Sequence, residues 1–147
     1  MFDAEFRTYG DDDPAIRGMR AQMTPGLWRL CEHLLGHWQQ AGMPVRPAGR
    51  GFALDAPHGD RLTTIGWVYP PDRRHVTPRL ELALDLLARR EIPPEHLDAL
   101  RDDVERFPTY VPRKGPGLAE LPLTTALSLE DLERLVRRLV QFGLALA

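Results

Sequence analysis

The hydrophobic pattern of this chain changes its period twice, and this change restricts the fold more than any other feature of the sequence. Residues 24–42 and 128–146 carry apolar side chains at the three- and four-residue spacing of a helix, whereas residues 52–87 alternate at the two-residue spacing of a strand. Helical segments on both sides of a block of strands indicate an α+β fold. We therefore predict a three- to four-stranded, mostly antiparallel sheet with two to three helices packed on one face.

Three segments with the two-residue period are separated by turn signals rich in proline, glycine and aspartate. The segments are residues 52–56, 61–69 and 80–87, and they predict an antiparallel meander. Helix is the alternative for 80–87, because leucine favours helices. A further strand over 119–123 is expected at a sheet edge, because Pro122 has no N–H to donate to a ladder.

The alternation also predicts which side chains share a face. The expected buried face contains Phe52, Leu54, Ile65, Trp67, Tyr69, Leu80, Leu82 and Leu84. The expected open face contains Asp55, Thr64, Gly66, Arg79, Glu81 and Asp85. An antiparallel sheet commonly packs one face and leaves the other in water.

The last helix has the clearest signals in the sequence. Ser128 is a good N-cap, and a broad apolar stripe that includes Leu139 follows it. The four-residue spacings Glu130–Arg134 and Glu133–Arg137 predict ion pairs on its exposed face. Helices are also expected over 14–23, 24–42 and 93–107, each opened by a proline that follows a capping or turn residue.

Length and composition bound the class of protein. A chain of 147 residues fits one domain over 1–147, in which residues 1–13 are expected to be frayed or to form an edge strand. Cys31 is the only cysteine, so neither an intramolecular disulfide nor a zinc cage made of cysteines can form. No secretory signal or membrane-length apolar run is visible, which predicts a cytoplasmic protein without a membrane partner.

Two basic loops are candidates for an anion or nucleic-acid site. They span 71–79 and 113–115 and carry Arg73, Arg74, His75, Arg79, Arg113 and Lys114. Such loops beside Trp67 and Tyr69 could hold phosphates while the aromatic rings stack on bases. Two observations favour solvated loops instead: the formal net charge is -2, and the strand pattern directs both aromatic rings inward.

The remaining candidates concern metal chemistry. His33 and His37 stand four residues apart, a spacing at which two helical histidines can share a metal ion, but the local order differs from the His-Glu-x-x-His motif. Asp55, Glu81 and Asp85 are carboxylates expected on the open face. Surface histidines and solvated strand charges are the simpler interpretation. No nucleotide-binding or nucleophile motif is present, and no cofactor is predicted.

These observations leave three functional hypotheses. The leading one is a non-catalytic binding or interaction module of unknown ligand that associates as a homodimer. The first alternative is a nucleic-acid-associated module that uses the two basic loops. The second is a small metal-dependent hydrolase built on His33 and His37 or on the open-face carboxylates.

Overall fold

The computed structural model describes residues 7–112 and 118–147 of the chain. These residues form an α+β fold with five strands and five helices. The strands are β1 (Val45–Ala48), β2 (Gly51–His58), β3 (Arg61–Tyr69), β4 (Arg79–Leu82) and β5 (Ala119–Pro122). The helices are α1 (Pro14–Arg20), α2 (Pro25–Gln40), α3 (Leu84–Arg89), α4 (Pro94–Glu105) and α5 (Leu129–Leu144). No helix in this part of the chain is long and apolar enough to cross a membrane.

The sheet is antiparallel throughout and has the order β1-β2-β3-β4-β5. The class and the antiparallel pairing confirm the sequence prediction, but a count of three or four strands was too low. The missed strand is β1, whose four residues include Pro47 and show no apolar alternation. As predicted, Pro122 lies in an edge strand, where it is the last residue of β5.

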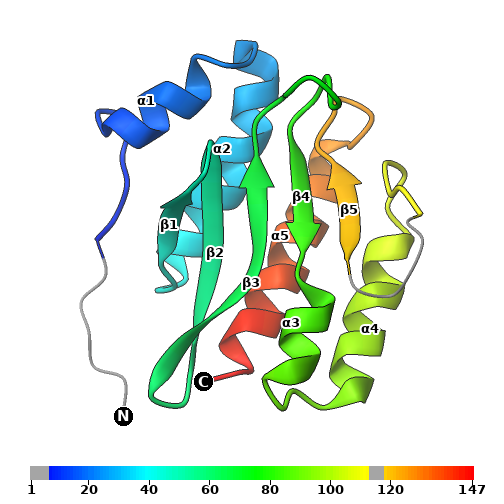
Figure 1. Cartoon of the computed structure of the whole chain (residues 1–147). Coiled ribbons are helices and arrows are strands. Elements are labelled where there is room, and N and C mark those ends of the chain that lie inside the picture. The colour runs from blue at the N-terminus through cyan, green and yellow to red at the C-terminus, as the bar shows by residue number, and fades with distance from the viewer. Residues whose placement is uncertain (1–6, 113–117) are drawn as a thin grey trace.

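The helices cover one face of the sheet. In Figure 1 the strands face the viewer, α2 and α5 pass behind them, and no described helix crosses in front. The buried apolar side chains form one continuous core between the sheet and the helices. Phe52, Leu54, Val68, Leu80 and Leu82 supply the sheet's share of it. The opposite face of the sheet is called the open face below.

Trp38 connects α2 to the sheet. Its side chain is fully buried, and its indole Nε1–H lies 3.1 Å from the carbonyl oxygen of Pro44 and 3.0 Å from that of Asp55. A buried indole needs such a partner, because an unpaired N–H in a core is costly. α5 packs on the same ring at Gly143, where a Cβ atom would lie 2.8 Å from Trp38. A glycine at this point therefore lets α5 approach α2 closely.

The segment that alternates leucines is divided between two elements. β4 ends at Leu82, and α3 begins at Leu84, so the prediction of one strand over 80–87 was wrong for its second half. Leu84 and Leu87 are buried, whereas Leu86 is 40% exposed, which is a helical pattern. The backbone N–H of Ala83 donates to the Ile65 carbonyl at 2.9 Å, and the chain then turns into the helix.

The N-terminal segment is hydrogen-bonded to α2 rather than to an edge strand, and the Tyr9 ring packs edge-to-face on Phe52 of β2. Residues 7–10 take no regular secondary structure, and residues 1–6 of the expected strand lie outside the described residues. The Gln39 side chain accepts a hydrogen bond from the Tyr9 N–H at 2.7 Å and donates one to the Tyr9 carbonyl at 3.2 Å. The amide of Gln39 thus replaces the strand partner that the sequence pattern suggested.

Candidate functional site

The open face carries an aromatic pair. Trp67 and Tyr69 stand two residues apart on β3, with ring centroids 6.4 Å apart and planes 14° from parallel. Both side chains are partly exposed. The sequence prediction that these two rings enter the core was therefore wrong.

A bulge in the sheet explains this error. The pairing of β2 with β3 shifts between Leu54 and Asp55, so that Ile65 is an additional residue on β3. Ile65 points into the core, and after the bulge Gly66 and Val68 lie opposite core residues of β4. A bulge reverses the inward and outward alternation of every residue that follows it. It therefore turns Trp67 and Tyr69 outward and places Gly66 on the core side, contrary to the prediction.

Arg79 lies beside the aromatic pair at the centre of a charged cluster. Its guanidinium carbon is 4.9 Å from the centroid of the Tyr69 ring, which is a cation–π distance. Its nitrogens lie 3.1 Å from Asp72, 3.3 Å from Glu81 and 3.7 Å from Glu120. Burial, followed by the charge of Glu81, raises the pKa of Tyr69, so its hydroxyl keeps its proton at neutral pH.

Asp72 fixes the loop between β3 and β4. Its carboxylate accepts hydrogen bonds from the backbone N–H groups of Arg74 at 2.8 Å and of His75 at 2.9 Å. The His75 ring lies 3.0 Å from Asp72 and 3.2 Å from Glu120, and thereby links the loop to β5. The Arg74 N–H and the His75 side chain are the main causes that hold the pKa of Asp72 well below its usual range.

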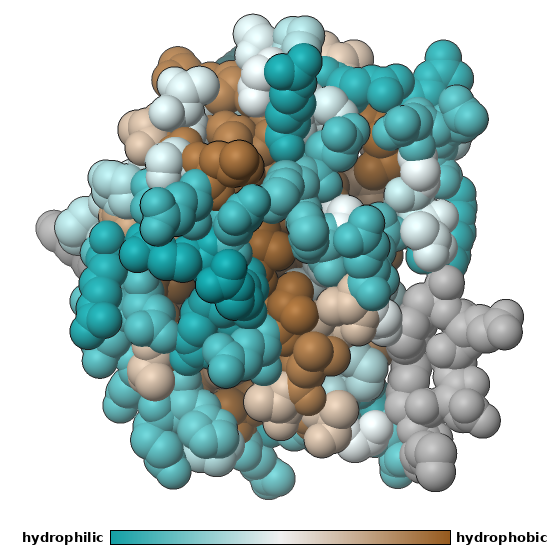
Figure 2. Space-filling view, turned by 180° about the vertical axis from the view of Figure 1, so that it is seen from behind, coloured by the Kyte–Doolittle hydropathy of each residue, from teal (hydrophilic) through white to brown (hydrophobic). Residues whose placement is uncertain are grey.

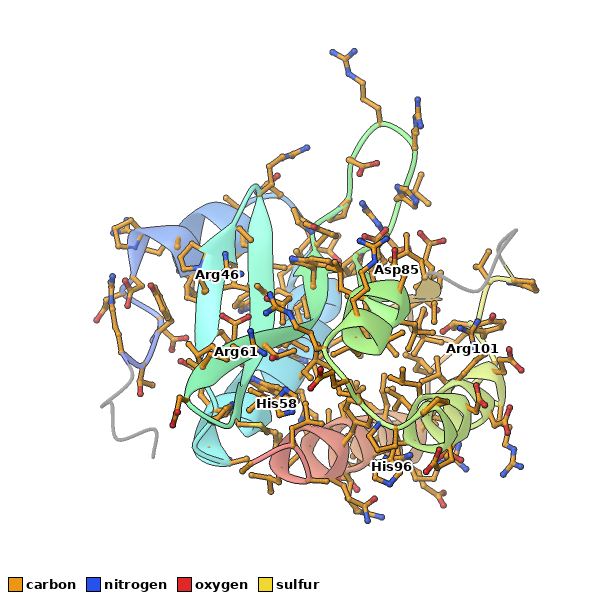
Figure 3. The ribbon with its side chains drawn as sticks, turned by 60° about the horizontal axis from the view of Figure 1, so that its bottom comes forward. Arg46, His58, Arg61, Asp85, His96 and Arg101 are labelled. Carbon is orange, nitrogen blue, oxygen red and sulfur yellow. The ribbon has the colours of Figure 1, made fainter. Side chains whose placement is uncertain are left out.

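The loop has a rigid base and a solvated tip. Arg73, Arg74 and Val76 are exposed, and Val76 is 88% exposed. Figure 3 shows this loop standing clear of the rest of the molecule. Within the described residues, the side chains of Arg73 and Arg74 form no ion pair, whereas His75 and Arg79 are each paired with carboxylates. The four basic residues of this loop therefore divide into two anchors, His75 and Arg79, and two available charges, Arg73 and Arg74.

A second ionic cluster lies across β1, β2 and β3. Arg46 Nε is 3.1 Å from Asp55 and an Arg46 terminal nitrogen is 3.3 Å from Thr64, whose hydroxyl donates to Asp55 at 2.8 Å. Asp55 and Glu81 both lie on the open face, as predicted. Asp85 does not join them, because it belongs to α3.

The second predicted basic loop is described only at its borders. Arg113 and Lys114 lie outside the described residues. Before them, Val111 donates its backbone N–H to the Glu120 carbonyl at 3.2 Å and forms a β-bridge with that residue. Glu120 thus connects Val111 with the loop between β3 and β4, since its carboxylate contacts His75 and Arg79. Sequence reasoning missed Glu120 because its role depends on the pairing of β4 with β5.

The two histidines of α2 lie side by side in a surface groove, away from the open face. Their ring centroids are 4.3 Å apart, and Glu133 of α5 lines the same groove. Burial and the neighbouring His37 lower the pKa of His33, while Glu133 acts in the opposite direction. Among the described residues, no group of three or more His, Cys, Asp or Glu side chains could hold a metal ion.

Comparison with known protein families, with curated proteins and with solved structures gave no match. The function is therefore inferred from the geometry of the open face.

Proposed function

We propose that this chain is a non-catalytic binding module that holds single-stranded nucleic acid on the open face of its sheet. The main observation in support of this proposal is the stacked pair of Trp67 and Tyr69 on a sheet face that no described helix covers. Aromatic rings outside a core retain apolar surface in water, a cost that a bound base would remove.

Stacking is the expected source of affinity. A base stacked on an aromatic side chain contributes about 1–3 kcal/mol, and the contact tolerates any base because each base has a π-face. Arg79 is held over Tyr69 by three carboxylates, so the ring and the guanidinium form one fixed surface. A fixed surface loses little entropy on binding.

The loop between β3 and β4 supplies the phosphate contacts. Arg73 and Arg74 stand on a base that Asp72 and His75 hold in place. Arg46 and Arg79 are neutralised by neighbouring carboxylates. Among the described residues, Arg73 and Arg74 therefore provide the available positive charge beside the open face. This limited charge agrees with a net charge of -2 and predicts binding with a weak dependence on salt.

The test is a titration of the protein into a labelled oligothymidylate, followed by fluorescence anisotropy. We expect Trp67→Leu to weaken binding about tenfold or more, because it removes one stacking surface. With two phosphate contacts, the slope of log K against log salt should be about −1.4, and Arg73→Gln/Arg74→Gln should bring it close to zero.

Arg89→Gln/Arg90→Gln is the matched control, since it removes the same charge from exposed positions at the end of α3. It should leave both the affinity and the salt slope nearly unchanged. Intrinsic tryptophan fluorescence gives a second readout, because Trp28 and Trp38 are buried and Trp67 is partly exposed. If Trp67→Leu does not weaken binding, the aromatic pair is not part of the binding site.

Two further proposals accompany this function. A cytoplasmic location is supported by the presence of a single cysteine, Cys31, which is buried as a free thiol.

The homodimer predicted from the sequence stays a prediction. Sheet extension is a poor route to it, because Pro47 and Pro122 each remove a donor from an edge strand. Sedimentation velocity over a range of concentrations tests it directly.

A further inference from the structure

A groove lined by arginines lies on the helical side of the molecule. It has a volume of about 320 Å³ and is formed by the C-terminal part of α4, the residues that follow it and the middle of α5. Four arginines line it: Arg106, Arg134, Arg137 and Arg138. Figure 2 shows the helical side, where strongly hydrophilic side chains gather beside a narrow apolar strip. This groove shares no lining residue with the open face.

The positive charge of the four arginines is not balanced by carboxylates among the residues that line the groove. Asp103 is the one carboxylate among the lining residues, and it pairs with Arg138. Arg134 pairs with Asp131 at 3.0 Å and lies over the Phe107 ring, with its guanidinium carbon 5.0 Å from the centroid. Guanidinium groups stay protonated at any ordinary pH, so these charges persist.

Two arginines of the groove lack a carboxylate partner. Within the described residues, neither Arg106 nor Arg137 forms an ion pair, and both are exposed. The predicted pair Glu133–Arg137 is not formed, although both residues line the adjacent histidine groove. The predicted pair Glu130–Arg134 is replaced by the pair of Arg134 with Asp131. α5 therefore presents arginine charge to the groove that its own glutamates do not neutralise.

Such an arrangement has a physical cost that a ligand would remove. Arg134, Arg137 and Arg138 occupy positions three and four residues apart on α5, where like charges repel one another and destabilise the helix. Planar guanidinium groups bind phosphate through paired N–H···O bonds. A volume of about 320 Å³ lies at the lower end of the range for small-molecule sites, so the groove suits a compact ligand.

We propose that this groove binds a small phosphate-bearing ligand, with Arg106 on the α4 side and Arg137 on the α5 side as its principal contacts. Arg134 and Arg138 are positioned by Phe107 and Asp103, and they add positive charge at the two sides of the ligand. Figure 3 labels His96, which lines a neighbouring opening between α4 and α5 together with Arg138. The site is independent of the nucleic-acid surface proposed above.

The test is isothermal titration of the full chain with two probes, inorganic pyrophosphate and ribose 5-phosphate. Neither carries a base, so stacking on Trp67 does not contribute. We expect binding of at least one probe, and a loss of tenfold or more in affinity in Arg106→Gln/Arg137→Gln. Tighter binding of pyrophosphate would identify the ligand class as a bare polyphosphate, and tighter binding of ribose 5-phosphate would identify it as a phosphate ester.

Stability gives a second readout that separates binding from folding. Without ligand, Arg106→Gln/Arg137→Gln should melt no lower than the parent, because it relieves repulsion between like charges. Arg89→Gln/Arg90→Gln is the control for net charge and should keep the affinity for both probes. Trp67→Leu should also keep that affinity, so the two proposals fail separately. The absence of binding at millimolar probe, or an affinity for sulfate equal to that for pyrophosphate, would overturn the proposal.

Discussion

At the scale of single residues, Asp72 determines the conformation of the loop between β3 and β4. One carboxylate oxygen accepts two backbone N–H groups and contacts the His75 ring, while the other binds Arg79. A carboxylate that accepts several hydrogen bonds is stabilised in its charged form. The loop conformation therefore depends on the ionisation of this group.

This dependence predicts an effect of pH on stability. The pKa of Asp72 is lower in the folded protein than the ordinary value of about 3.9 expected in the unfolded chain. Its ionised form therefore favours folding above about pH 5, and this contribution is lost as the pH falls through the unfolded pKa toward the folded one. The free energy of unfolding can be measured by urea titration at several pH values between neutral and acid. It should fall less steeply with decreasing pH in Asp72→Asn than in the parent.

The control for this measurement is Asp98→Asn, a change of equal charge at an exposed position on α4. It should follow the parent curve over the same pH range. If Asp72→Asn also follows the parent curve, Asp72 does not hold the loop through its charge.

The residues of this loop also show how far sequence reasoning reaches. Arg73, Arg74, His75 and Arg79 were recognised as one basic segment, because composition is visible in the sequence. Their division into anchors and available charges was not visible. It depends on Glu120, which is 41 positions from Arg79 in the chain and reaches it only through the pairing of β4 with β5. Side chains that meet across strands need the topology before their partners can be named.

At the scale of elements, α5 organises the core on the helical side. Ser128 and Asp131 form a capping box, in which each side chain accepts the other's backbone N–H at 3.0 and 3.2 Å. The buried stripe that follows contacts both α2 and the sheet. The sequence predicted this helix well because capping and stripe are both local signals. Leu129, the first residue of the helix, lies outside this stripe and is 67% exposed.

Two of the leucines of this helix, Leu139 and Leu129, provide a matched pair of substitutions. Leu139→Ala should reduce the free energy of unfolding by about 2–5 kcal/mol, because Leu139 is fully buried and its truncation leaves a cavity. Leu129→Ala makes the same chemical change at an exposed site and should change it by less than about 0.5 kcal/mol. Urea denaturation of both variants gives the comparison. Equal losses would show that α5 is oriented differently on the core.

Element boundaries within the sheet were less predictable than α5. A strict two-residue period over 80–87 indicated one strand, but the same leucines also satisfy a helix that starts at Leu84. The bulge beside Leu54 leaves no signature in the alternation of β3, and it reverses the direction of Trp67 and Tyr69. The candidate site therefore could not be placed on the correct face from the sequence. Its residue types could be identified, but not their orientation.

At the scale of the whole molecule, Cys31 reports on the integrity of the fold. Cys31 is a residue of α2, and its thiol is fully buried. Its sulfur lies 3.9 Å from that of Met23, in the segment after α1. Burial raises the pKa of the Cys31 thiol to about 12. Only the thiolate reacts readily with disulfide reagents, so the native chain should resist them at neutral pH.

Two kinds of motion could expose Cys31, and thiol labelling distinguishes them. If exposure requires global unfolding, the free energy obtained from labelling rates should equal that from urea denaturation and fall with urea at the same slope. If α1 and Met23 detach alone, labelling should be faster and nearly independent of urea. We expect the first result, because Ile16 and Met19 of α1 are buried in the same core as Cys31. Labelling that urea does not accelerate would instead show that α1 opens as a separate unit.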